Sequence, residues 1–216
     1  MKQLQSVGAG LAACIVGASI WAAIAYFANF EIGWIAWGIG GLVGVAVYKF
    51  EPNPGLPSGL IAVVLTCASI AGGKYLGVHF AVNQFMDENN LNESPDLADE
   101  ELVVSYVADE VVSEWQADGK TVAWPKGVNP MEAAAEADYP AGVWREASQR
   151  WNGYSTNEQD DFKQSIVVAH QVNISRFKSE VTAEAFKESF GVIDIIFFLL
   201  GIATAYKVGA GGITTE

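Results

Sequence analysis

Long apolar stretches that are almost free of charge constrain this chain more than any other feature. Outside residues 86–189 the sequence contains four lysines and four acidic residues, whose charges cancel. Residues 86–189 contain 21 acidic and 8 basic residues, so this block holds the whole formal net charge of −13. An acidic block set between apolar stretches is typical of a membrane protein that has one water-soluble domain.

Four apolar segments each approach the length of about 20 residues that a helix needs to cross a bilayer. They are Val7–Phe30, Ile32–Tyr48, Ser58–Val82 and Phe190–Tyr206. The connection between the first two segments is so short that it predicts a tight helical hairpin. Pro52, Pro54 and Pro57 prevent a continuous helix between the second segment and the third.

These segments predict an all-α integral membrane protein with four transmembrane helices and a helical soluble domain inserted between the third and fourth. The predicted parts are an N-terminal transmembrane hairpin (1–56), a third transmembrane helix (57–85), an acidic helical soluble domain (86–189), and a fourth transmembrane helix with a C-terminal tail (190–216). Leu11-Ala12-Ala13-Cys14 also has the shape of a lipoprotein cleavage box. The apolar run continues well past Cys14, which favours a transmembrane helix instead.

The few lysines near the ends of the apolar segments predict the orientation of the chain. With four crossings, Lys2, Lys49 and Lys207 fall on one side of the membrane. The positive-inside rule places that side in the cytoplasm. We therefore expect an inner-membrane protein whose acidic domain is periplasmic or external. Arg176 and Lys187, close to the fourth segment, favour the opposite orientation.

Small residues recur at four-residue spacing in the first two segments, where they allow close approach of helix backbones. The predicted helix-packing residues are Gly10, Cys14 and Ala18 in the first segment, and Ala36, Gly40 and Gly44 in the second. Such stripes pack the hairpin on itself or on the third segment. Alternatively, they form contacts with a second copy of the chain or with a partner subunit.

Two ionisable residues lie inside apolar segments, Lys74 in the third and Asp194 in the fourth. Charged side chains within a bilayer are costly and usually face a partner or water. In the predicted topology the two residues lie at similar depth, so we predict an ion pair between Lys74 and Asp194. The alternative is that each side chain reaches separately towards the lipid headgroups.

Tryptophans mark several candidate interfaces. Trp34 and Trp37 lie near the turn of the first hairpin, as in the aromatic belt of a membrane protein. Trp115, Trp144 and Trp151 lie on apolar faces of helices predicted in the acidic block. These three residues form either a docking surface or the core of a helical bundle.

The acidic block contains several start and stop signals for helices. We expect one helix to start at Pro95, a short helix at Pro130–Ala137, and a third helix from Pro140 to Gly153. The sequence Ser155-Thr156-Asn157-Glu158 is a capping box. The helix that it opens contains no glycine or proline before Gly191, so it could run directly into the fourth membrane segment.

Composition and motifs exclude several functions. A sequence pI of about 4.5 argues against nucleic acid as a partner. No zinc-protease, phosphate-loop or serine-hydrolase motif is present, and the acidic clusters lack the ligand spacing of a calcium loop. His170 lies on an apolar helix face, which is typical of a core histidine. We therefore expect no enzymatic activity, no cofactor and no metal site.

Two stretches resemble motifs of small, uncharacterised bacterial multi-pass membrane proteins. One is the hairpin motif EIGWIAWGIGGLVG, from Glu31 to Gly44. The other lies in the final helix and consists of Asp194–Phe198 together with Thr204–Lys207. The resemblance implies an integral membrane protein of bacterial type. It implies no reaction, cofactor or functional residue.

These features together predict a structural or accessory subunit of a bacterial membrane assembly. The expected partners are the lipid bilayer and either further copies of the chain or other membrane subunits, bound through the glycine-rich helices and the acidic domain. One alternative is a subunit of an oligomeric cation channel or transporter with an acidic vestibule that concentrates cations. A metal-dependent membrane enzyme is a third possibility and requires that His79, His170 and acidic residues converge.

Overall fold

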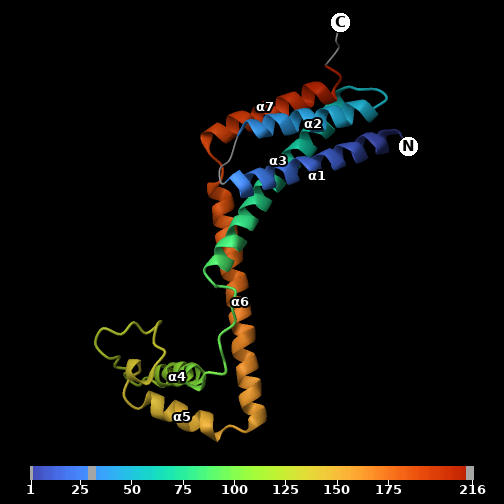
Figure 1. Cartoon of the computed structure of the whole chain (residues 1–216). Helices are drawn as coiled ribbons and strands as arrows, with labels where there is room; N and C mark the ends of the chain where they lie inside the picture. Colours follow the sequence, from blue (N-terminus) through green and yellow to red (C-terminus); the bar gives the residue numbers. More distant parts are fainter. Residues whose placement is uncertain (1, 29–32, 213–216) are drawn as a thin grey trace. The chain divides into compact units, whose positions relative to one another are not determined.

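The computed structural model describes residues 2–28 and 33–212, in which every regular element is a helix and no strand occurs (Figure 1). The helices are α1 (Lys2–Ala28), α2 (Trp34–Phe50), α3 (Leu56–Glu88), α4 (Glu100–Ala117), α5 (Val143–Gly153), α6 (Thr156–Glu188) and α7 (Val192–Gly209). The all-α prediction is confirmed for these residues. The predicted hairpin turn falls largely on residues 29–32, which lie outside the described part of the chain.

The described helices include three that are long and apolar enough to cross a membrane, namely Leu4–Phe27 within α1, α3 and α7. This composition is that of a membrane-embedded protein. Helix α2 is also apolar but has 17 residues, a length of about 26 Å at 1.5 Å per residue. That length is slightly below the roughly 30 Å of a bilayer's hydrocarbon core.

The chain divides into two compact units, Met1–Leu91 with Phe177–Glu216, and Asn92–Arg176. The second unit covers fewer residues at both ends than the soluble domain predicted over residues 86–189. Helix α6 contributes its first part to the second unit and its last turns to the first unit.

In the first unit α1, α2, α3 and α7 pack together as one helical bundle. Helices α1 and α3 run parallel, because Gly10 lies beside Leu65 and Trp21 lies beside Gly73. Helices α2 and α7 are also parallel and lie side by side (Figure 1). Helices α3 and α7 run antiparallel, since the Ser58 hydroxyl donates to the Gly209 carbonyl at 2.7 Å.

The centre of this bundle is filled by apolar side chains from its helices. The fully buried members of the core include Val43, Val47, Ala62 and Ala205. The start of α1 is tied to the end of α2 by the Ser6 hydroxyl, which donates to the Glu51 carboxylate at 2.8 Å. The start of α1, the end of α2, the start of α3 and the end of α7 therefore lie at one end of the bundle.

Helix α4 of the second unit begins at Glu100, so the predicted start at Pro95 is wrong. The Asp99 carboxylate accepts the Glu101 backbone N–H at 3.0 Å and caps the helix there. The Asp96 carboxylate accepts the Ala98 N–H at 3.0 Å and holds the preceding residues in a turn. Val103, Val107 and Val111 of α4 are buried in the core of the unit.

The helix predicted over Pro130–Ala137 is replaced by turns and a single 3₁₀ turn, Glu136–Asp138. The Asp138 carboxylate accepts the N–H groups of Ala134 and Ala135 at 3.2 and 3.1 Å, in place of helical carbonyl groups. Helix α5 begins at Val143, three residues after the predicted start. Gly142 has a φ of +90°, a left-handed conformation that favours glycine and separates Pro140 from the helix.

The capping box that opens α6 is confirmed. The Glu158 carboxylate accepts the Ser155 N–H at 2.7 Å, and the Ser155 hydroxyl accepts the Glu158 N–H at 3.4 Å. The helix ends at Glu188 and does not continue into α7. A new helix starts after Gly191, whose N–H donates to the Asp194 carboxylate at 2.9 Å.

Candidate functional site

Lys74 is the most completely buried charged side chain among the described residues, with 1% of its surface exposed. Its α3 backbone places the ammonium group against the start of α7. Nζ donates to the Ser189 carbonyl and lies 3.4 Å from Oδ2 of Asp194. The structure therefore brings together the two residues that the sequence predicts as an intramembrane ion pair.

Two aromatic rings also lie close to this ammonium group. Nζ lies 4.9 Å from the centre of the Phe190 ring and 5.7 Å from the centre of the Trp21 ring. Both distances are within the range of cation–π attraction, which is strongest where water is excluded. The lysine thus links α1, α3 and α7 through one charged group. The sequence pattern did not reveal the contribution of either ring.

Asp194 is held in place by its position in the first turn of α7. Its Oδ2 atom accepts the Gly191 N–H at 2.9 Å, while the side chain remains 19% exposed. A carboxylate is favoured at this position because the N-terminus of a helix carries partial positive charge. Asp194 therefore both caps α7 and pairs with the lysine of α3.

A cavity of about 320 Å³ adjoins the ion pair. Apart from the two charged residues, its lining is apolar and comes from Trp21, Ala36, Ile70, Phe190, Ile195 and Phe198. The chemistry available at this site is ionic pairing and cation–π attraction. Both hold helices together, so the site is suited to fixing the bundle.

The predicted small-residue stripe of α1 packs against α3. Gly10 faces the Leu65 side chain, and the Cys14 carbonyl accepts the Ser69 hydroxyl at 2.8 Å. The Ala18 carbonyl lies directly against Gly73. These contacts correspond to the expectation that the stripe packs on the third segment of the same chain.

The predicted stripe of α2 packs against α7. A methyl group added to Gly40 would overlap the carbonyl oxygen of Gly201, and one added to Gly201 would overlap Ala36. Gly44 meets Ala205 in the same way one turn later. Sequence reasoning missed the α7 side of this contact, although Gly201 and Ala205 have the same four-residue spacing.

Trp34 and Trp37 lie on the outer face of α2, with 59% and 54% of their surfaces exposed. The Trp37 indole N–H donates to the Thr204 hydroxyl at 2.9 Å and so has a fixed orientation. Gly38 and Gly41 are on the same side of α2, and no atom lies within 4 Å of the position that a Cβ would take. This outer face of α2 therefore combines two exposed aromatic rings with two glycines that no other described helix covers.

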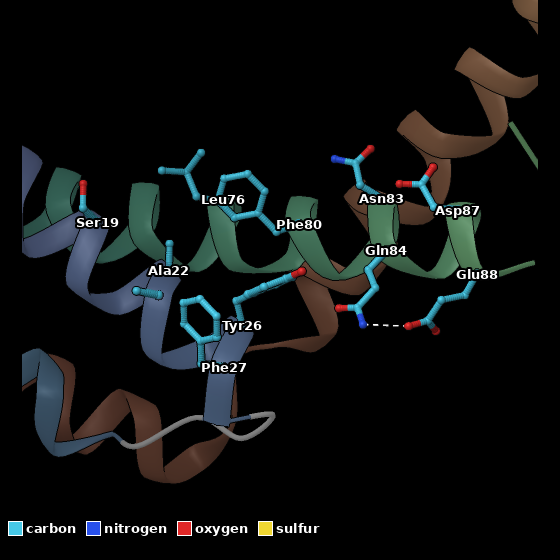
Figure 2. A pocket seen from close by; sticks show the side chains of 11 residues that line it. Ser19, Ala22, Tyr26, Phe27, Leu76, Phe80, Asn83, Gln84, Asp87 and Glu88 are labelled. Atoms are coloured by element: carbon cyan, nitrogen blue, oxygen red, sulfur yellow. Dashed lines mark hydrogen bonds between the residues drawn. The ribbon is translucent and has the colours of Figure 1, made fainter.

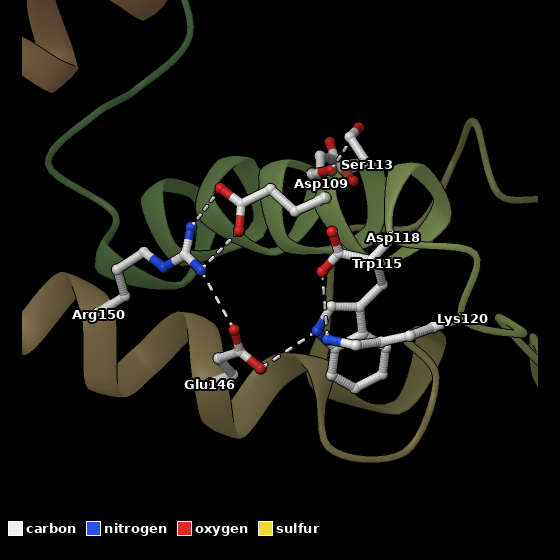
Figure 3. Close-up of polar contacts among 8 residues, drawn as sticks. Asp109, Ser113, Trp115, Asp118, Lys120, Glu146 and Arg150 are labelled. Carbon is white, nitrogen blue, oxygen red and sulfur yellow. Dashed lines mark hydrogen bonds and ion pairs between the residues drawn. The ribbon is translucent and has the colours of Figure 1, made fainter.

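Trp115, Trp144 and Trp151 pack within the second unit. Trp151 is a buried member of its core, and the other two rings pack against that core. Figure 3 shows the polar layer beside it, where Arg150 binds both carboxylate oxygens of Glu114, at 2.8 and 2.9 Å. Glu146 accepts from Arg150 and from the Trp115 indole, both at 3.2 Å. Of the two roles that the sequence leaves open for these tryptophans, the packing corresponds to the core of a helical bundle.

The pair formed by Glu114 and Arg150 predicts a pH-dependent contribution to stability. Hydrogen bonding to Arg150 lowers the pKa of Glu114 below its ordinary value. A carboxyl whose pKa is lowered in the folded state stabilises the fold at pH values above its ordinary pKa. This stabilisation is lost as the pH falls through the lowered pKa. Glu114→Gln is expected to destabilise α4 and α5 slightly near neutral pH and to have a smaller effect in acid.

Hydrogen exchange of the full chain, measured at about pH 7 and about pH 3 with the rates corrected for pH, checks this expectation. Peptides from α4 and α5 are expected to exchange faster in the variant at neutral pH, and this difference is expected to become smaller at the acidic pH. Asp118→Asn is the matched control, because Asp118 contacts the exposed Lys120 at 3.7 Å and no arginine. Equal exchange in the two variants at neutral pH would contradict the prediction.

The two histidines lie in different units. His79 of α3 stacks on Tyr75 with ring centres 6.1 Å apart. His170 of α6 lines a cavity of about 280 Å³ together with Tyr106 and Glu110, and burial raises the pKa of Glu110. The described residues include no group of three or more histidine, cysteine or acidic side chains placed to bind one metal ion.

Comparisons of the chain with protein-family models, with curated proteins and with solved structures give no match.

Proposed function

We propose that this chain is a non-catalytic structural or accessory subunit of a bacterial inner-membrane assembly, with four transmembrane helices. Helix α2 is the shortest of the four proposed spans, with 17 residues, so its crossing needs further support. Gly33 at its start lies against Phe197, and Gly44 lies against Val208 near the end of α7. Helix α2 thus accompanies α7 along most of its length, and α7 is a candidate membrane span. This parallel packing favours a fourth crossing by α2.

The positions of the lysines support a cytoplasmic location for both ends of the chain. Lys49 and Lys207 lie in the last turns of α2 and α7, at the end of the bundle where α1 begins. The positive-inside rule favours the cytoplasm for this end. Residues 92–176, which contain 16 acidic and 6 basic residues, then lie on the periplasmic or external side.

The outer face of α2 is the observation that carries the proposed role. The stripes at Gly10–Ala18 and Ala36–Gly44 are already used within the chain. Gly38 and Gly41 instead face open space beside two exposed tryptophans. Small residues on a lipid-facing helix allow another helix to approach closely, and van der Waals packing then drives association. We propose that this face binds a second copy of the chain or another membrane subunit.

The packed centre of the bundle weighs against conduction through a single chain. Val43, Val47, Ala62 and Thr66 are all fully buried there. A cation pathway would therefore have to lie between subunits. The acidic second unit would then concentrate cations at its entrance.

Native mass spectrometry of the full chain, extracted in mild detergent, tests the proposed role. The expected result is a stable complex larger than one chain, which Gly38→Leu/Gly41→Leu converts to a monomer that keeps its thermal stability. Gly8→Leu is the matched control, since Gly8 also faces open space but lies on α1. A monomer for the unsubstituted chain, in detergent and in lipid nanodiscs, would contradict the proposal.

A further inference from the structure

A groove of about 560 Å³ lies between the end of α1 and the C-terminal half of α3, within the first unit (Figure 2). The α1 side is formed by Ser19, Ala22, Ala23, Tyr26 and Phe27, and the α3 side by Leu76, Phe80, Asn83, Gln84, Asp87 and Glu88. The groove changes in chemistry along its length. Its deeper part is apolar and aromatic, and its outer part is polar and acidic.

The aromatic part marks the depth of the groove in a membrane. The Tyr26 ring packs edge-on against Phe27 at 5.1 Å and against Phe80 at 6.2 Å, measured between ring centres. These rings lie at the end of the candidate span Leu4–Phe27. Aromatic side chains gather at the boundary between hydrocarbon and headgroups, so the groove opens at that boundary.

The polar part of the groove begins at the depth of the headgroups. Asn83 and Glu88 follow Phe80 by three and eight residues on α3, or about 5 to 12 Å along the helix axis. The headgroup layer adds several Å outside each face of the hydrocarbon core. Asp87 and Glu88 give this end of the groove two carboxylates, and its lining contains no lysine or arginine. The Gln84 amide donates to Glu88 at 2.7 Å, which leaves the charge of the carboxylate in place.

We propose that this groove binds a phospholipid with a primary ammonium headgroup, phosphatidylethanolamine. An acyl chain fits the apolar wall between α1 and α3. The ammonium group lies at the acidic end of the groove, where it donates hydrogen bonds to a carboxylate oxygen, and the Asn83 amide can donate to the phosphate. The inference rests on the placement of α1 and α3 in a membrane and is independent of the accessory role.

Charge and hydrogen bonding together define the specificity of the groove. Two carboxylates repel an anionic headgroup such as that of phosphatidylglycerol. A choline headgroup carries the same positive charge as ethanolamine but has no N–H to donate. Charge-assisted hydrogen bonds are about twice as strong as neutral ones, so the primary amine is preferred over the quaternary one.

Native mass spectrometry of the full chain, titrated with each of the three lipids in mild detergent, tests this specificity. Phosphatidylethanolamine is expected to bind about fivefold more tightly than phosphatidylglycerol, since the two headgroups differ by one charge and each surface charge contributes about a factor of five. Asp87→Asn/Glu88→Gln is expected to remove this preference. Glu93→Gln/Asp96→Asn removes the same charge outside the groove and is expected to leave the preference unchanged. Equal binding of both lipids to the unsubstituted chain would overturn the proposal.

A second variant separates the groove from charge effects. Ala23→Trp places a large ring in the apolar part and is expected to abolish the lipid adducts. Ala12→Trp is the matched control, because Ala12 is exposed on the same face of α1 three turns earlier. If Ala23→Trp instead leaves the lipid adducts intact, the groove is not a lipid site. The same conclusion follows if the unsubstituted chain forms a protein complex without bound lipid and Ala23→Trp dissociates that complex. A monomeric chain that retains the lipid preference would contradict the accessory role alone.

Discussion

Asp194→Asn is expected to lower the free energy of unfolding of the bundle of α1, α2, α3 and α7 by about 3 to 5 kcal/mol, the cost of breaking a buried ion pair by removing the charge of one member. Asparagine has nearly the same shape as aspartate and can still accept the Gly191 N–H. The loss therefore comes from the ammonium group of Lys74, which is 1% exposed. The Ser189 carbonyl and two aromatic rings still contact the ammonium group but supply no countercharge.

Thermal unfolding of the full chain in one detergent, followed by circular dichroism, measures this loss. Lys74→Met/Asp194→Asn is expected to recover most of it, because methionine fills the same volume and packs well on aromatic rings. Lys207→Met is the control for loss of an exposed lysine from the bundle and is expected to change little. If Asp194→Asn is as mild as Lys207→Met, or if the double variant is the least stable, Lys74 and Asp194 do not form a stabilising pair.

Gly40→Val is the second substitution with a large expected effect, a loss of about 3 kcal/mol or more. Overpacking of a core usually costs about 1 to 3 kcal/mol. This site belongs at the upper end because the added Cβ meets backbone, the carbonyl group of Gly201, which cannot change rotamer. Helices α2 and α7 must separate, and the contacts of Gly44 with Ala205 and Val208 are lost with them.

The same thermal measurement checks this expectation, with Gly8→Val as the matched control. A Cβ on Gly8 meets no atom within 4 Å, so the control carries the change in helix propensity without the overlap. Gly40→Ala is expected to be intermediate, because one methyl group already overlaps Gly201. Equal stability of Gly40→Val and Gly8→Val would show that α2 and α7 do not pack through these glycines.

The sequence was informative where a physical constraint relates residues that lie far apart along the chain. A charged residue inside a membrane segment needs a partner, and the fourth segment contains one acid at similar depth. This argument predicted Lys74 and Asp194 as partners without any structural information. The rings of Trp21 and Phe190 could not be predicted in the same way, because an aromatic side chain in an apolar segment has many possible neighbours.

The small-residue stripes show the limit of pattern reasoning in a membrane bundle. Spacing identifies which face of a helix is small, but the choice of the facing helix depends on how four helices fit together. The stripe at Ala36 and Gly40 meets Gly201 of the last helix, far along the chain. The sequence pattern does not distinguish Gly38 and Gly41, which face open space, from Gly40 and Gly44, which α7 covers.

Helix boundaries in the acidic block depended on individual side-chain hydrogen bonds. Pro95 is a suitable first residue of a helix, yet the Asp99 carboxylate caps the chain four residues later. Residues 130–137 have helical composition, but Asp138 and Asn129 accept backbone N–H groups and favour turns. Several aspartates can serve as caps in such a stretch, and tertiary packing decides among them.

The central claim is that α1, α2, α3 and α7 each cross the membrane. Labelling of single cysteines at Gln5, Asn53 and Ser113 with a membrane-impermeant maleimide in intact cells tests it, after Cys14 and Cys67 are replaced by alanine. All three positions are exposed. Four crossings predict that residue 113 is labelled from outside, whereas residues 5 and 53 are labelled only after the membrane is opened. Labelling of residues 5 and 113 from the same side would contradict the account, because α2 would then not cross.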